Sequence, residues 1–203
     1  MKLKISPGFA LITALMILFD QNGACWQFLL AAALHEAAHV AALKRAGADI
    51  LSFELNAAGG VTRIAAVPAV SYAREAAAVL AGPAANLAAA IFCALLARHV
   101  SDGVAQRWLF MFSGVNAMMG AFNLLPAGSL DGGRAILLLA SLRGRADAGT
   151  AAMTLSTLLL SLILLPAGIY SLVHTGWNFS LLAAGLFLLV SGLADGWGIL
   201  KCS

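Results

Sequence analysis

Long apolar runs separated by short polar loops dominate the sequence. Six such segments lie at residues 5–19, 24–43, 76–97, 108–130, 148–173 and 175–194, and the fourth continues past Asp131 to residue 142. A helix needs roughly 20 apolar residues to cross the hydrocarbon core of a bilayer. The pattern therefore predicts an all-α membrane protein: a bundle of about six transmembrane helices, with residues 1–203 as a single domain and no separate soluble domain.

A different period appears between the second and third segments. Leu51, Phe53 and Leu55 alternate with polar residues, and Gly59-Gly60 and a short run at residues 61–64 follow. Alternation of this kind is typical of strands, and glycine pairs are typical of the turns between them. We therefore predict a small β-hairpin after the second span, with an irregular loop as the alternative.

Composition supports a lipid environment. The chain is 62% hydrophobic and 10% charged, whereas soluble domains have about 45–50% apolar and about 25% charged residues. The net charge of +3 comes from basic residues in the loops between apolar runs. These residues are better interpreted as topology signals than as a nucleic-acid surface. The expected partner is the lipid bilayer, and no nucleic acid is expected.

The loop charges predict an orientation. With the N-terminus inside, the inner loops hold nine basic residues and the outer loops hold Arg98 and Arg107. Cytoplasmic loops carry the excess of Lys and Arg. We therefore expect a multi-pass protein of the cell membrane with both termini in the cytoplasm and the hairpin at the cytoplasmic interface. The nine inner residues are Lys2, Lys4, Lys44, Arg45, Arg63, Arg74, Arg143, Arg145 and Lys201.

The motif HEAAH at residues 35–39 lies within the second span. On a helix, His35 and His39 share one face about one turn apart, so that both imidazoles can bind one metal ion. Glu36 points to one side, where it can take a proton from a water molecule at the metal. Placing such polar residues inside a bilayer costs free energy, so their presence within a span indicates a functional role. The alternatives are a buried polar cluster and an amphipathic surface helix.

A zinc site that keeps one position open needs a third protein ligand. Asp131 follows Pro126 and Gly128 and precedes Gly132-Gly133, which indicates a broken helix. Irregular backbone within the membrane is tolerated where its unpaired polar groups are buried in protein or face a polar cavity. Asp131 is therefore a candidate third ligand, although pairing with Arg134 one helical turn on would also account for its charge.

A third motif, AGPAAN at residues 81–86, lies in the third span. Small residues favour close helix packing, and the proline favours a kink. By itself the motif carries little functional information, and Asn86 is equally well interpreted as a polar contact between helices.

Together, HEAAH, AGPAAN and NLLPAGSLDGG at residues 123–133 resemble, in order, spacing and topology, the site-2 protease family of intramembrane zinc metalloproteases. The six-span layout looks most like the branch of the stage IV sporulation protein FB. That branch usually has proline two residues before the aspartate, where this chain has Ser129. The change alters the loop and removes no ligand.

The resemblance implies one Zn²⁺ per chain held by His35, His39 and Asp131, with Glu36 as general base and Asn123 as a polar residue facing the oxyanion. It implies hydrolysis of peptide bonds in or near transmembrane segments of membrane proteins or membrane-associated peptides, with regulatory membrane proteins as further partners. The hairpin would pair with an unwound substrate as an added strand. The rival hypothesis is a non-proteolytic zinc-binding membrane protein or metal transporter.

Overall fold

The structure of the chain is a computed structural model that describes residues 2–20, 23–56, 59–64, 70–176 and 179–202. The chain divides into two compact units, Met1–Phe122 and Asn123–Ser203. In chain order the elements are β1 (Lys2–Ile5), α1 (Pro7–Phe19), α2 (Ala24–Arg45), β2 (Ile50–Asn56), β3 (Gly59–Ile64), α3 (Tyr72–Ala97), α4 (Gly103–Asn123), α5 (Asp131–Leu142), α6 (Ala146–Thr175) and α7 (Ser180–Cys202).

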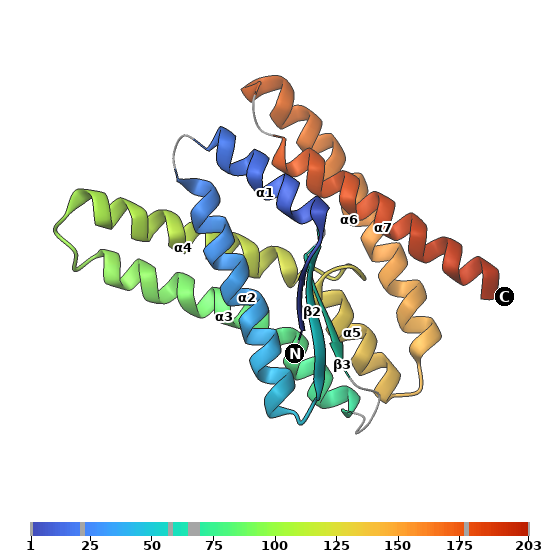
Figure 1. Ribbon diagram of the computed structural model, residues 1–203. Coiled ribbons are helices and arrows are strands. Elements are labelled where there is room, and N and C mark those ends of the chain that lie inside the picture. The colour runs from blue at the N-terminus through green and yellow to red at the C-terminus, as the bar shows by residue number, and fades with distance from the viewer. Residues whose placement is uncertain (1, 21–22, 57–58, 65–69, 177–178, 203) are drawn as a thin grey trace. The chain divides into compact units, whose positions relative to one another are not determined.

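The first unit contains a three-stranded sheet in the order β1-β2-β3 (Figure 1). β1 runs parallel to β2, and β2 runs antiparallel to β3. Strands therefore occupy the segment in which the alternation around Leu51 predicts them. Gly59 and Gly60 belong to β3 instead of preceding it. Residues 57–58 lie outside the described residues, so the hairpin and its place at the cytoplasmic interface stay predictions.

The predicted first span at residues 5–19 is wrong at its start. Ile5 is the last residue of β1, and α1 begins at Pro7. Residues 2–5 alternate lysine with apolar residues, which is the period of a strand. Pro7 suits a first helical position because an N–H there would have no partner within the helix, and proline carries none. The 13 residues of α1 extend about 20 Å, which is less than the roughly 30 Å of a hydrocarbon core.

The long helices α2, α3 and α4 of the first unit approach one another at small residues. A Cβ placed on Gly120 of α4 would lie 3.1 Å from the carbonyl oxygen of Pro83 in α3. Ala31 of α2 and Ala90 of α3 are also buried. Because small side chains separate the helices so little, a polar group on one helix can contact the next helix directly.

The predicted interruption around Pro126 is confirmed, because α4 ends at Asn123 and α5 begins at Asp131. Other boundaries differ from the prediction, including the end of the last helix, which lies at Cys202 instead of 194. α4 begins at Gly103, five residues before the expected start at 108. The last helix begins at Ser180, not at 175, because α6 runs on to Thr175 and stops where Gly176 adopts a left-handed conformation with φ 72°.

The second unit consists of α5, α6 and α7. α6 and α7 pack closely where glycines face backbone. A Cβ on Gly168 of α6 would lie 2.5 Å from the amide nitrogen of Leu182 in α7, and one on Gly185 would lie 3.0 Å from that of Leu165. Glycines at such crossings let two apolar helices approach to backbone contact.

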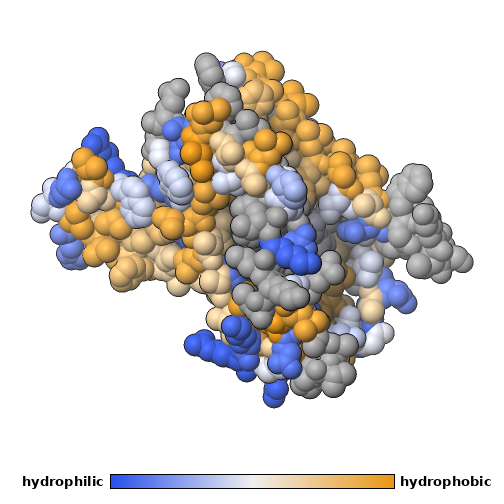
Figure 2. Space-filling view, in the orientation of Figure 1, coloured by the Kyte–Doolittle hydropathy of each residue, from blue (hydrophilic) through white to orange (hydrophobic). Residues whose placement is uncertain are grey.

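Large apolar side chains cover much of the described surface. Figure 2 shows hydrophobic residues over much of the α6 and α7 pair, whereas the turn between α3 and α4 is hydrophilic. Leu162, Ile163 and Val190 are each 63–67% exposed. Two of the described helices, α3 and α6, are long and apolar enough to cross a membrane by length and composition. The six-span arrangement beyond them stays a prediction.

Candidate metal centre

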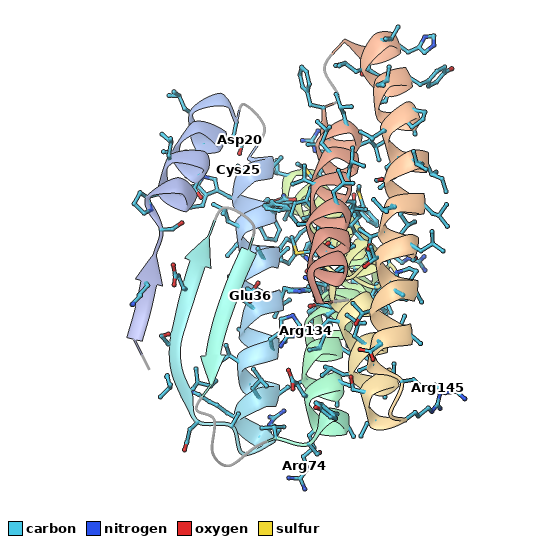
Figure 3. All side chains as sticks on the ribbon, turned by 90° about the vertical axis from the view of Figure 1, so that its right-hand side faces the viewer. Asp20, Cys25, Glu36, Arg74, Arg134 and Arg145 are labelled. Atoms are coloured by element: carbon cyan, nitrogen blue, oxygen red, sulfur yellow. The ribbon has the colours of Figure 1, made fainter. Side chains whose placement is uncertain are left out.

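The helix that carries HEAAH is fixed at its N-terminus by Asp20. Its carboxylate accepts hydrogen bonds from the amide of Ala24 at 3.1 Å and from that of Cys25 at 2.8 Å. Asp20 and Cys25 lie next to each other at the start of α2 in Figure 3. A carboxylate at this end also opposes the positive end of the helix dipole. Two amides of the first turn of α2 are thereby satisfied without a side chain from its N-cap residue, Gly23.

His35 and His39 lie one turn apart on α2 and converge. Their Nε2 atoms are 3.0 Å apart, and the two rings meet edge to face at 83° with centroids 4.6 Å apart. His35 is 6% exposed. The spacing predicted from the motif is therefore realised in side-chain positions, with two nitrogens directed at one point.

The other nitrogen of each ring faces an oxygen atom. Nδ1 of His39 is 2.9 Å from the carbonyl oxygen of Ala78, and Nδ1 of His35 is 2.5 Å from Oδ1 of Asn86. A carbonyl oxygen can only accept, so each Nδ1 carries the hydrogen when the rings are neutral. Both Nε2 atoms then present lone pairs to the same point. A cation placed there would remove their mutual repulsion.

Gly82 leaves the room that such a cation needs. A Cβ at this position would contact Nε2 of His39 and lie 2.8 Å from Nε2 of His35. Gly82 and the neighbouring Pro83 are both buried in α3. Glycine in the AGPAAN motif therefore lets the backbone of α3 approach the two Nε2 atoms. Two imidazole nitrogens in a space kept free of side chains match the donor set that zinc prefers.

Glu36 is half-buried and lies in the middle of α2, along the stretch beside which the strands run (Figure 3). Its position next to His35 on the same helix turn keeps it within one residue of the proposed ligand set. A carboxylate there can accept or release a proton beside the metal without being a ligand itself.

In the second unit, Asp131 is the first residue of α5 and is half-buried. The helix starts hard against the preceding loop, since a Cβ on Gly133 would contact the backbone of Ala127 and one on Gly132 that of Leu124. A carboxylate at a helix N-terminus is stabilised by the helix dipole. The two glycines thus fix where the Asp131 backbone lies.

The loop before Asp131 is held by one side chain of α6. The amide of Gly128 donates to Oγ1 of Thr157 at 3.0 Å, and that hydroxyl donates to the carbonyl of Met153 at 2.7 Å. Thr157 is 0% exposed. Asn123, the residue predicted to face the oxyanion, is the last residue of α4 and is half-buried.

Sequence reasoning missed Thr157 and Asn116 and left Asn86 undecided. Asn86 and Asn116 are both 0% exposed and hydrogen-bonded to each other at 2.7 Å. Single polar residues in apolar helices give a weak signal, because each can also serve as an ordinary contact between helices. Their partners depend on how the helices pack, which the linear pattern does not specify.

No established family profile matches the chain. The chain is similar to the protein named "Putative zinc metalloprotease Rip3" in two strains of Mycobacterium tuberculosis. Each match is 38% identical over 116 residues and covers 53% of this chain. The chain spans 28% of the length of these relatives.

Among solved structures, the fold is similar to the "Site-2 Protease from Methanocaldococcus jannaschii". The sequences are 23% identical, and the match has a TM-score of 0.69 over 95% of this chain and 89% of the other. The two proteins therefore share a fold over nearly their whole matched length.

Proposed function

We propose that the chain is a zinc-dependent intramembrane endopeptidase of the site-2 protease family. The observation that carries the proposal is the pair of Nε2 atoms of His35 and His39, 3.0 Å apart with both Nδ1 atoms facing oxygens, with Glu36 as the next residue on the same helix. The shared fold and the 38% identity to a protein named as a zinc metalloprotease support it. The order of the three motifs favours the stage IV sporulation protein FB branch within that family.

In this proposal one zinc ion per chain is held by His35, His39 and Asp131, each of which offers one ligand atom. When bound, zinc would polarise the scissile carbonyl and make water more acidic. Glu36 takes the proton from the attacking water and passes it to the leaving amine. Asn123 donates to the oxygen that becomes negative as the carbonyl is attacked. The two units of the chain would act as one protease domain.

The proposed substrate is a transmembrane or membrane-associated segment that can unwind, because a helical peptide bond is shielded. An extended segment can add to a sheet edge through main-chain hydrogen bonds. The outer strands of the described sheet are β1 and β3, so we place substrate pairing at one of these two strands. The two helices apolar enough to span a bilayer and the exposed apolar side chains support a multi-pass place in the cell membrane.

Replacing Glu36 by Gln tests the reaction. The variant should keep zinc at one ion per chain by elemental analysis, since Glu36 is not a ligand, and should lose cleavage. The readout is the set of new peptide termini in membranes of cells that express the wild-type chain or the variant. Glu75→Gln makes the same substitution in the first turn of α3 and should cleave like the wild type.

Cleavage that survives Glu36→Gln would refute the proposed mechanism. The rival hypothesis, a zinc-binding protein or transporter without hydrolytic activity, predicts no difference in peptide termini between the wild type and Glu36→Gln. It also predicts zinc flux into liposomes that contain the purified wild-type chain. The proposed protease should show the difference in termini and no such flux.

A further inference from the structure

A chain of buried amide groups connects α4 through α3 to His35 on α2. Asn116 of α4 donates through Nδ2 to the carbonyl of Phe112 at 2.9 Å. Asn86 of α3 donates through Nδ2 to Oδ1 of Asn116 at 2.7 Å and to the carbonyl of Ala31 at 3.1 Å. Oδ1 of Asn86 then faces Nδ1 of His35 at 2.5 Å.

The orientation of each amide follows from its partners. The carbonyl of Phe112 can only accept, so Nδ2 of Asn116 must face it and Oδ1 must face Asn86. The carbonyl of Ala31 and Oδ1 of Asn116 are both acceptors, so they require the two hydrogens of the Asn86 amide nitrogen. A flipped Asn86 would bring two pairs of acceptors together inside a fully buried site, where an unmade hydrogen bond is costly.

We propose that Asn86, supported by Asn116, is a positioning residue that keeps the hydrogen of His35 on Nδ1, so that the lone pair of Nε2 can bind zinc. The hydrogen bond made by one ring nitrogen decides which nitrogen can act as a ligand. If the acceptor at Nδ1 is lost, the hydrogen can move to Nε2, which is the atom directed at the metal. The inference rests on the proposed zinc site and adds residues outside its ligand set.

His39 offers an internal comparison within the same site. Its Nδ1 faces the backbone oxygen of Ala78, which no side-chain substitution removes. His35 instead depends on a side chain for the hydrogen-bond acceptor at its Nδ1. The two ligands should therefore respond differently to changes at position 86, which a general loosening of the helices would not produce.

The opposing explanation is that Asn86 and Asn116 only hold α2, α3 and α4 together. Ser113 provides a matched control for that role. Its hydroxyl on α4 donates to the carbonyl of Ala90 on α3 at 2.7 Å, so it joins the same two helices three residues before Asn116. Ser113→Ala removes this contact without touching either histidine.

The experiment uses the full chain in lipid nanodiscs and two readouts. The first is the zinc dissociation constant, measured by competition with a chelator. The second is the ¹⁵N spectrum of histidine-labelled, metal-free protein at about pH 8, where an ordinary histidine is neutral. Long-range couplings in that spectrum report which ring nitrogen carries the hydrogen, without any requirement for activity.

Asn86→Leu should weaken zinc binding about 10–100-fold, the usual cost of losing such a partner. It should also shift the hydrogen of His35 toward Nε2 while His39 stays unchanged. Asn86→Asp keeps an oxygen that accepts from His35, so it should restore zinc binding close to the wild-type level even where it lowers thermal stability. Asn116→Leu should have a smaller effect than Asn86→Leu, because Ala31 still orients the Asn86 amide. Ser113→Ala should change neither readout.

The inference is overturned if Asn86→Leu leaves both the zinc affinity and the His35 spectrum unchanged. It is also overturned if Ser113→Ala weakens zinc binding as much as Asn86→Leu does. A wild-type chain that binds no zinc would instead refute the proposed function. In that case the spectrum of the metal-free protein still tests whether Asn86 decides which ring nitrogen of His35 carries the hydrogen.

Discussion

At the scale of single residues, the absence of one methyl group shapes the candidate metal centre. Gly82 lies where any Cβ would contact Nε2 of both His35 and His39. The imidazoles could avoid such a Cβ only by turning away from the point at which they converge. Zinc binding depends on ligand geometry held within fractions of an ångström. The role of Gly82 is therefore steric and separate from any flexibility it gives α3.

Gly82→Ala should weaken zinc binding by about 10–100-fold or more, comparable to losing an outer-shell partner. Helicity should be retained, since alanine favours helices. Chelator competition measures the affinity and circular dichroism the helicity. Gly114→Ala is the matched control, because this glycine is also helical but a Cβ added to it would meet nothing within 4 Å. Wild-type zinc affinity in Gly82→Ala would contradict the steric account.

The linear motif predicted His35, Glu36 and His39 because periodicity on one helix is local information. It could not predict Asn86 as the partner of His35, since that contact requires α3 to approach α2 at Gly82 and Pro83. The same holds for Ala78, whose contribution is a backbone oxygen with no side-chain signature. Residue identity indicated the candidate ligands, whereas helix packing determines which groups their second nitrogens face.

At the scale of elements, the loop before α5 decides where Asp131 begins its helix. Three hydrogen bonds from backbone amides define it. The amide of Ala127 donates to the carbonyl of Leu125 at 2.8 Å, and that of Leu130 donates to the carbonyl of Ala127 at 2.9 Å. The amide of Gly128 donates to the side-chain Oγ1 of Thr157 at 3.0 Å. The last of these ties the loop to α6. Ser129, where the resembling branch has proline, is exposed in this loop.

Thr157→Val removes the hydroxyl but keeps the shape of the side chain. The amide of Gly128 then loses its acceptor, which should lower the free energy of unfolding by about 1 kcal/mol, the low end for an unsatisfied group because Gly128 is half-buried. Denaturant titration in mixed micelles measures this change. Thr157→Ser retains the hydroxyl and should unfold like the wild type. Equal stability of all three proteins would show that Thr157 does not hold the loop.

Helices could be predicted from the sequence where the apolar run that forms them is long. The apolar segments that became α2, α3 and α6 end within a few residues of the expected positions. β1 was not predicted, because its four residues, Lys2–Ile5, give only two periods of alternation and lead directly into an apolar helix. β1 also pairs in parallel with β2, about 50 residues away in sequence. No tight turn joins two such strands, so the sequence next to β1 contains no turn signal that would indicate a strand.

At the scale of the whole molecule, the described residues place polar groups inside and apolar groups outside. Gln27, Asn86, Asn116, Thr157 and Ser161 are at most 2% exposed, whereas many leucines and isoleucines are more than 50% exposed. A protein in water would expose the opposite set. In a bilayer, exposed leucine contacts lipid, and the buried amides of Asn86 and Asn116 find hydrogen-bond partners inside the protein. This distribution supports the proposed membrane location.

The distribution of charge then predicts how the chain lies in that membrane. α3 is one of the two described helices apolar enough to span it, and its ends differ in charge environment. Lys44, Arg45 and Arg63 precede it and Arg74 lies in its first turn. Arg98 follows it and Arg107 lies near the start of α4, at the end that is expected outside. A green fluorescent reporter fused at either terminus should therefore fluoresce, since it folds in the cytoplasm.

Alkaline phosphatase, which is active only after export, should be active when fused in the turn between α3 and α4 and inactive when fused before α3. The physical reason is that basic residues are held on the cytoplasmic side during insertion. Moving charge tests that cause: Arg98→Gln with Arg107→Gln should leave the orientation unchanged or more uniform, because it removes the opposing charges. Active phosphatase before α3 and inactive phosphatase after it would contradict the predicted orientation. The chain would then lie the other way round in the membrane, with the proposed zinc site nearer the opposite face.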